Sequence, residues 1–343
     1  MEKRVLSIVI AILTVILLPR VSLGAAPYYE GKTVRIIVGH SAGGGFDTYA
    51  RIVGRHLGKH LPGNPTVVVE NMVGAGSLIA AKYLYSRAKP DGLTLGTLTG
   101  QIVVAQILGR EGVDIDTRKF EWLGEPVQDH VVVVFTKKSG ITSMEKWMAS
   151  QTPAKIGGTA PGDTTVDVPR ILKAALNLPI QLVEGYKGTA EIRLASETGE
   201  VGGSCWQWES VKVTWSKAIE SGDVVVVLQI TPRALPDLPK VPLAINYAKT
   251  EEARELIRMG IDEPATITRP FFLPPGTPKE QVQMLRTAFQ ETLKDPALLE
   301  EATKAKLEIN PMTGDQIGEV VNRLFDMKPA VRTKLKEILF PSK

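Results

Sequence analysis

The sequence predicts an α/β protein that folds as two lobes, and three observations point to this class. Short apolar runs alternate with helical patterns along the chain, as is typical of strands and helices that build a largely parallel sheet. With 343 residues, the chain exceeds the size at which one hydrophobic core usually divides. A proline-rich stretch over residues 232–242 is too kinked for a helix or a strand, and it suits a crossing between lobes.

Residues 1–26 have the order of a secretory signal peptide. The basic residues Lys3 and Arg4 precede an apolar run over residues 5–18, and small residues follow as far as Ala26. This run is shorter than the roughly 20 residues that a membrane-spanning helix needs, although an uncleaved anchor stays open as an alternative. We therefore expect a cleavable signal peptide and a mature chain in the periplasm.

The composition excludes several classes of protein. A single cysteine, Cys205, rules out an internal disulfide and a lipid-anchoring cysteine at the end of the signal. The sequence offers no histidine near Cys205 that could activate it as a nucleophile, so we interpret Cys205 as a buried structural thiol. The net charge of +4 and the lack of a basic run with interleaved aromatics exclude a nucleic-acid partner. No cluster has the spacing of metal ligands, so we expect neither a metal nor a cofactor.

Two blocks of strands and helices can be traced along the chain. The first block contains a helix whose apolar stripe runs from Tyr49 to Leu57, and its strands are expected at 33–38, 66–69 and 94–98. The second block begins with a strand at 131–136 and ends with one at 224–230. We expect a discontinuous first lobe with an inserted second lobe: residues 27–127 in the first lobe, 128–242 in the second, and 243–343 as a helical tail that returns to the first.

A glycine-rich loop lies between the first strand and its helix. Gly39, Ser41 and Gly43 fit the G-x-S-x-G pattern of serine hydrolases, but nothing upstream can supply an oxyanion loop, and no histidine lies in the later half of the chain. P-loop and dinucleotide patterns are incomplete. What remains is a helix N-terminus, whose unpaired N–H groups and positive dipole end favour an anion. A tight turn without a ligand is the alternative. The candidate ligand contacts are Ala42, Gly43, Gly44, Gly45 and Asp47.

The second lobe has a comparable loop at residues 157–165, again between a strand and a helix. Two such loops could close on one small molecule, each holding it by main-chain N–H groups and threonine hydroxyls. Asp163 could instead simply cap the helix. Trp206 belongs either to the cleft or to the core, because alternate residues of a strand face opposite sides. The candidate contacts here are Thr159, Gly162, Asp163, Thr164 and Trp206.

Several short motifs follow one another along nearly the whole mature chain. They are residues 32–38 with the glycine loop, Val68–Gly76, Pro90–Leu95, Tyr186–Gly188, Gly199–Val201, Leu235–Pro239 and Pro274–Pro278. Their order and spacing resemble the substrate-binding receptors of the tripartite tricarboxylate transporter family, the Bug-type extracytoplasmic receptors. The resemblance implies a type II periplasmic-binding-protein fold, no catalysis, and delivery of carboxylates or related small molecules to a two-component membrane permease.

The resemblance also implies which parts of the chain contact the ligand. These are the loops at 42–47 and 159–164 and the region of Tyr186, acting largely through backbone and water. Departures from the family pattern lie around this expected pocket. His40 stands where the family commonly has proline, Phe46 replaces a small polar residue, and an aspartate-bearing stretch is replaced by Gly202, Trp206 and Trp208.

We therefore expect an extracytoplasmic substrate-binding protein, monomeric, that captures a small organic anion for the integral-membrane permease subunits of a transporter. Thr99, which follows the strand at 94–98, completes the candidate contacts. Two alternatives stay open. One is a receptor-like sensor or assembly partner without a transport role. The other is a secreted serine hydrolase with Ser41 as its nucleophile.

Overall fold

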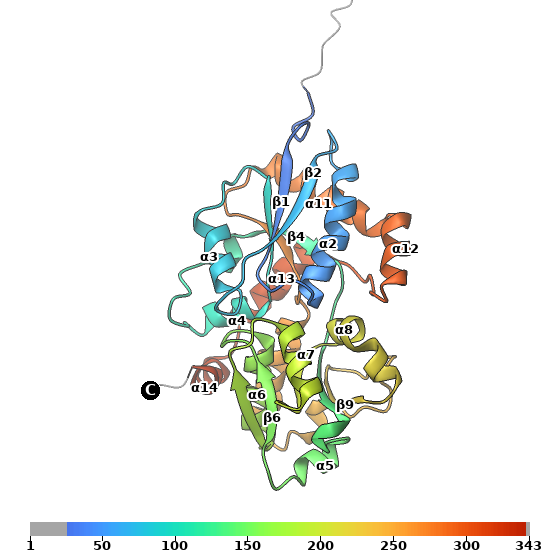
Figure 1. The fold of residues 1–343 in the computed structure, drawn as a ribbon. Helices are drawn as coiled ribbons and strands as arrows, with labels where there is room; N and C mark the ends of the chain where they lie inside the picture. The colour runs from blue at the N-terminus through green and yellow to red at the C-terminus, as the bar shows by residue number, and fades with distance from the viewer. Residues whose placement is uncertain (1–25, 341–343) are drawn as a thin grey trace, which may run out of the picture.

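The chain forms two β-sheets, one in each of two lobes (Figure 1). The computed structural model describes residues 26–340, so the expected signal peptide lies outside the described residues except for Ala26. The six strands of the first sheet lie in the order β11, β4, β10, β3, β1, β2. They are β1 (Thr33–Val38), β2 (Thr66–Asn71), β3 (Thr94–Thr97), β4 (Glu121–Glu125), β10 (Phe271–Leu273) and β11 (Met312–Thr313).

The second sheet has five strands in the order β7, β6, β8, β5, β9. They are β5 (Val131–Thr136), β6 (Ala154–Gly158), β7 (Ile180–Glu184), β8 (Gly203–Gln207) and β9 (Val224–Ile230). The expectation of a largely parallel sheet is only partly right. Strand β10 enters the first sheet antiparallel to β3 and β4, and β5 lies antiparallel to β8 and β9 in the second.

Helices cover both sheets. In the first lobe and its return they are α2 (Gly45–Leu57), α3 (Leu78–Ser86), α4 (Gln101–Ile107), α10 (Glu263–Ala265), α11 (Lys279–Lys294), α12 (Pro296–Lys304) and α13 (Gly314–Phe325). On the second lobe they are α5 (Met144–Met148), α6 (Thr164–Leu176), α7 (Thr189–Thr198), α8 (Trp208–Glu220), α9 (Glu251–Ile257) and α14 (Pro329–Leu339). No helix among residues 26–340 combines the length and apolar character needed to cross a membrane.

The apolar patterns account for the core. In α2, the stripe of Tyr49, Ile52, Val53 and Leu57 is buried, as its spacing predicts. His56 lies on the same stripe and its Nε2 contacts Glu301 Oε2 at 2.8 Å, so its polar ring is satisfied at the edge of the core.

The tail does not return to the first lobe at residue 243. Leu243 bridges to Gln229 of β9, and α9 packs on α6 of the second lobe. The chain re-enters the first sheet at β10 and leaves that lobe again after α13, because the buried apolar faces of α9 and α14 both pack against α6. Figure 1 shows α14 beside the second lobe, near α6. Within the described residues the backbone therefore crosses between the lobes three times, near residues 126–130, 266–270 and 326–328.

Candidate ligand-binding site

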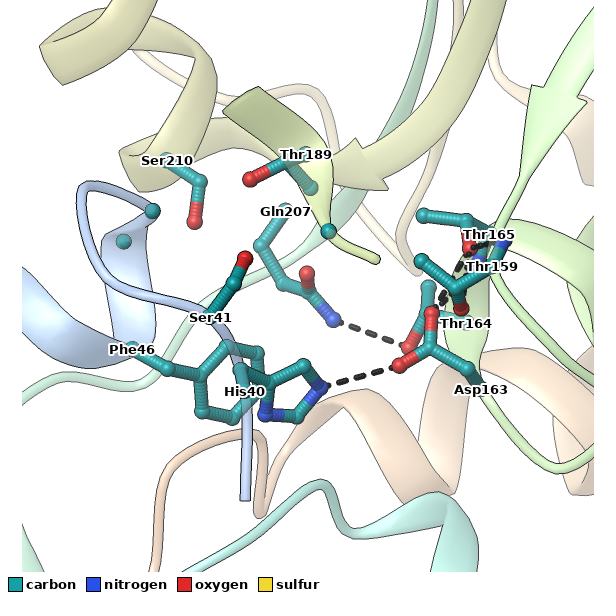
Figure 2. Close-up of a pocket in the computed structure, with 13 residues that line it drawn as sticks. His40, Ser41, Phe46, Thr159, Asp163, Thr164, Thr165, Thr189, Gln207 and Ser210 are labelled. Carbon is teal, nitrogen blue, oxygen red and sulfur yellow. Dashed lines mark hydrogen bonds and ion pairs between the residues drawn. The ribbon is translucent and has the colours of Figure 1, made fainter. Parts of the chain in front are cut away.

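A small cavity lies between the lobes, at the place where both predicted glycine loops meet. Its volume is about 20 Å³, room for roughly one or two water molecules. The first lobe contributes residues 40, 41 and 44–46, and the second lobe contributes three segments (Figure 2). An organic molecule enters such a space only if the lobes separate first.

Four helices begin at this cavity. Helix α2 comes from the first lobe, and α6, α7 and α8 come from the second. The N-cap residues of α2, α7 and α8 are Gly44, Gly188 and Gln207, and none of them makes a side-chain hydrogen bond to its helix. The first N–H groups of α2 and α7 therefore lack a side-chain cap, and the positive dipole ends of these two helices point toward one space. At α8, by contrast, the N–H of Glu209 donates to Asp129 Oδ1 at 3.2 Å and the N–H of Trp208 donates to the carbonyl of His130 at 2.8 Å.

The start of α6 carries its own anion, in the form of its N-cap side chain. Asp163 caps this helix: its Oδ1 accepts hydrogen bonds from Thr165 N at 3.0 Å and from Thr165 Oγ1 at 2.7 Å. The predicted alternative that Asp163 caps the helix is thus confirmed, and the same side chain also lines the cavity. Burial by itself would raise the pKa of Asp163, but the bonds to His40 and Thr165 hold it below its usual value, so the group is a carboxylate at neutral pH.

An ion pair joins the lobes across the cavity. His40 Nε2 lies 2.9 Å from Asp163 Oδ2, and the two side chains are 14% and 6% exposed. The His40 ring stacks on Phe46 with ring centroids 3.9 Å apart, which fixes the plane of the imidazole. Within residues 26–340 no lysine or arginine lines the cavity, so His40 is the one basic side chain on its wall, and it faces Asp163.

Two hydroxyl groups on the cavity wall each accept a hydrogen bond from a neighbouring side chain. Ser210 Oγ accepts from Arg269 Nη2 at 2.6 Å, and Thr164 Oγ1 accepts from Gln207 Nε2 at 3.0 Å. Both residues line the cavity (Figure 2). A hydroxyl that accepts a hydrogen bond keeps its own proton for another partner, so each can donate to an anion in the cavity.

Glycines permit the lobes to approach this closely. A Cβ atom on Gly45 would overlap the Ser210 side chain of the opposite lobe, and one on Gly188 would overlap Ser41. A Cβ on Gly44 would come within 3.0 Å of Thr189 Oγ1. The glycine-rich sequence at residues 43–45 is therefore needed for contact between lobes as well as for the turn.

Behind the cavity, a network of buried charges joins two of the crossings. Arg269 is fully buried, and its Nη1 lies 2.5 Å from Asp129 Oδ2. The backbone N–H of Arg269 donates to the Glu125 carboxyl group at 3.0 Å. Complete burial raises the pKa of Glu125 well above its usual value. We call Glu125, Asp129 and Arg269 the hinge network.

The hydrolase alternative is not supported by the geometry of the serines. His40 contacts Ser77 Oγ at 3.3 Å as well as Asp163, but Ser77 is 2% exposed, donates to the carbonyl of Gly39 and does not line the cavity. Ser41 does line the cavity, yet among the described residues no hydrogen bond joins it to a histidine. Neither serine has both a base and access to a substrate.

The structure brings five of the twelve predicted contact residues to the cavity wall: Gly44, Gly45, Thr159, Asp163 and Thr164. Two others shape the loops behind it. Asp47 accepts a hydrogen bond from Gly43 N at 3.0 Å, which places the carboxyl group inside the turn. Likewise, Gly162 N donates to Asp167 at 2.9 Å.

The remaining predicted contacts lie away from the cavity wall. Ala42 and Gly43 are exposed at the outside of the loop, and Thr99 is buried with its Oγ1 facing the N–H of Gln101. Tyr186 donates its hydroxyl to Glu200 at 2.6 Å. The proposal that Trp206 lines the cleft is corrected: its indole is fully buried and stacks on Trp215, because its face of β8 packs against α8.

Eight lining residues were not predicted as contacts: His40, Ser41, Phe46, Thr165, Gly188, Thr189, Gln207 and Ser210. The last five lie at helix starts that follow strands of the second lobe. Cys205 is fully buried, and burial raises the pKa of its thiol, as expected of a structural cysteine.

Comparison with curated proteins identifies relatives of nearly the same length. A family model described as "Tripartite tricarboxylate transporter family receptor" matches residues 49–326. A protein of Cupriavidus necator from the gbd 5' region is 26% identical over 327 residues, which cover 90% of this chain and 89% of that protein. A protein of Agrobacterium vitis is 27% identical over 299 residues, covering 84% of this chain and 79% of its own.

Solved structures of the same kind share the fold. The periplasmic binding protein BugD superposes with a TM-score of 0.74 at 22% identity, covering 90% of this chain and 98% of its own. MatC of Rhodopseudomonas palustris, solved with bound malate, gives a TM-score of 0.68 at 20% identity with the same coverage. The two-lobed architecture is thus of the type II periplasmic-binding-protein kind. Since the family model spans most of the described residues, this chain belongs to the receptors of the tripartite tricarboxylate transporter family.

Proposed function

We propose that this protein is an exported solute receptor that closes its two lobes around a small organic carboxylate and delivers it to the membrane permease of a tripartite transporter. The observation that carries the proposal is the meeting of two uncapped helix starts, α2 from the first lobe and α7 from the second, at one cavity whose wall, as far as the described residues form it, contains no lysine or arginine. Such a site holds an anion by main-chain N–H groups and helix dipoles.

Two further observations support this reading. The hydroxyls of Thr164 and Ser210 add neutral donors that point at the same space. Structures of similar fold are described with malate and with adipate, both of them carboxylates. A periplasmic location agrees with the order of residues in the expected signal peptide and with the family.

A thermal-unfolding screen tests the proposal. The purified protein is heated with each of a panel of small mono-, di- and tricarboxylates, and the corresponding uncharged amides serve as matched controls. At least one carboxylate should raise the unfolding temperature, because a ligand present at about 100 times its Kd adds roughly 2.7 kcal/mol of stability. The amides should have no such effect. If no carboxylate shifts the transition, or if an amide shifts it equally, the proposed function is wrong.

A further inference from the structure

The anion-favouring start of α6 is already occupied by a side chain of the protein itself. Asp163 Oδ1 accepts two hydrogen bonds from Thr165, and Oδ2 contacts His40 at 2.9 Å. Both carboxylate oxygens therefore have partners, and the group is held in place from both lobes. The start of α8 is occupied as well, because the N–H of Glu209 donates to Asp129 at 3.2 Å. Of the four helix starts at the cavity, those of α2 and α7 remain for a ligand.

The charges around the cavity provide for one ligand carboxylate. Among the described residues that line the cavity, His40 is the only basic side chain, and it faces Asp163. Behind the wall, Arg269 donates to Ser210, but its charge is paired with Asp129 at 2.5 Å. Arg110 packs against Gly162 and does not line the cavity. A second carboxylate of a ligand would thus lie near the carboxylate of Asp163, with no cationic side chain on the cavity wall to pair with it. Like charges placed next to each other in a desolvated site cost several kcal/mol.

We propose that the His40–Asp163 ion pair makes this receptor select ligands with a single carboxylate and reject the dicarboxylates that the similar structures hold. This inference rests on the proposed function, since it presupposes that the cavity binds carboxylates. It assigns to Asp163 the role of a specificity-determining residue, which discriminates by repulsion instead of by a contact with the preferred ligand.

Calorimetric titration with matched pairs tests this inference. Butyrate with succinate, 3-hydroxybutyrate with malate, and hexanoate with adipate each differ only in a terminal methyl or carboxylate group. We compare the two compounds of the pair that contains the tightest-binding ligand. In that pair, the monocarboxylate should bind at least about tenfold more tightly than the dicarboxylate. The variant Asp163→Asn, which keeps an oxygen for the Thr165 N–H group, should narrow this ratio by about tenfold. If Asp163→Asn folds poorly, Asp163→Ser, which keeps a hydroxyl that can cap the helix, replaces it in the same titrations.

Asp262→Asn is the control. Asp262 also carries a partly buried carboxyl group, but it lies just before α10 and does not line the cavity, so its replacement should leave the ratio unchanged. The inference is overturned if the parent protein binds the dicarboxylate as tightly as its partner, or if the ratio is the same in the Asp163 variants as in the parent. A parent protein that binds no member of any pair overturns the proposed function, and this inference with it.

Discussion

The cleft and the hinge network are both buried, polar and shared by the two lobes, but they are built from different groups. The cleft consists of glycines, helix starts and hydroxyls, with one ion pair between the lobes, His40–Asp163. The hinge network consists of charged side chains with fixed partners, such as Arg269 and Asp129, which are each only 1% exposed.

This difference separates permanent contacts from reversible ones. Breaking a buried ion pair leaves a charge without its partner in a desolvated place, so the hinge network should stay intact when the lobes move. Main-chain donors at helix starts can exchange a ligand for water at little cost, so the cleft can open. We therefore expect the lobes to stay attached at the hinge network and to separate at the cleft.

The largest expected effect comes from breaking the hinge network. Arg269→Met should lower the free energy of unfolding by about 3–5 kcal/mol, because Asp129 would stay buried without its partner. Urea unfolding followed by circular dichroism measures this loss. Adding Asp129→Asn should recover part of it.

Arg118→Met is the control for this prediction. The ion pair of Arg118 with Asp116 lies at the surface, where the Arg118 side chain is 53% exposed. The Arg118 variant should therefore lose much less unfolding free energy than Arg269→Met. Equal losses for Arg118→Met and Arg269→Met would show that the hinge network is no more important than a surface pair.

The next effect concerns closure of the cleft. Gly45→Ala should weaken carboxylate binding by at least about tenfold, because the added Cβ overlaps Ser210 and keeps the lobes apart. Its unfolding in the absence of ligand should change little. Gly318→Ala is the matched control, since a Cβ there has no neighbour within 4 Å. If calorimetry gave the Gly45 variant the affinity of the parent protein, Gly45 and Ser210 would not be in close contact when the ligand is bound.

A buried carboxyl group behind the cleft lacks the pairing that Asp129 has in the hinge network. Burial raises the pKa of Asp167 to about 7, and the nearby Asp163 charge adds to this, although Gly162 donates a hydrogen bond. The folded state therefore binds a proton at Asp167 more tightly than the unfolded chain does. The protonated Asp167 carboxyl group contributes stability that is fully present below pH 3.8 and is lost as the pH rises to about 7.

Asp167→Asn should therefore flatten part of the decline in unfolding free energy between pH 4 and pH 7. Part of the decline should remain, because burial also raises the pKa of Asp262 to about 7. Chemical unfolding at several pH values checks this. An unchanged slope in the variant would show that Asp167 titrates normally in the folded protein.

The smallest effect concerns a single hydroxyl of the cleft. Thr164→Ala should weaken ligand binding by about 0.5–1.5 kcal/mol, the net contribution of one neutral hydrogen bond. Calorimetry with the best carboxylate measures the difference. Thr292→Ala removes a buried hydroxyl that bonds within α11, far from the cleft, and should leave the affinity as it is. A loss much larger than this range would mean that side chains, and not helix starts, dominate recognition.

The sequence predicted the elements that have strong periodic patterns. Strands at 33–38, 131–136 and 224–230 have the predicted bounds, because each is an apolar run between turn signals. Strand β4 and strand β10 were not predicted, since β10 has only three residues and depends on its neighbours in the sheet. The path of residues 243–270 was likewise set by packing of α9 against α6, which no local pattern reveals.

The site could be predicted in part for the same reason. Glycine loops before helices signal helix starts in the sequence, and so Gly44, Gly45 and Thr164 were found. Gly185 and Gly188 precede α7 but are not consecutive glycines, and no glycine directly precedes α8, so Thr189 and Ser210 were missed. His40 and Asp163 are 123 positions apart, and their pairing exists only because the lobes meet.

Hydrogen exchange followed by mass spectrometry, with and without the best carboxylate of the screen, tests the central claim most directly. On binding, peptides that contain residues 39–46, 159–165 and 207–210 should become strongly protected. Peptides that contain residues 125–130 and 266–271 should exchange slowly in both states, because the hinge network does not open. The account is contradicted if saturating ligand leaves the cleft peptides unchanged, or if the hinge peptides exchange as fast as the open cleft.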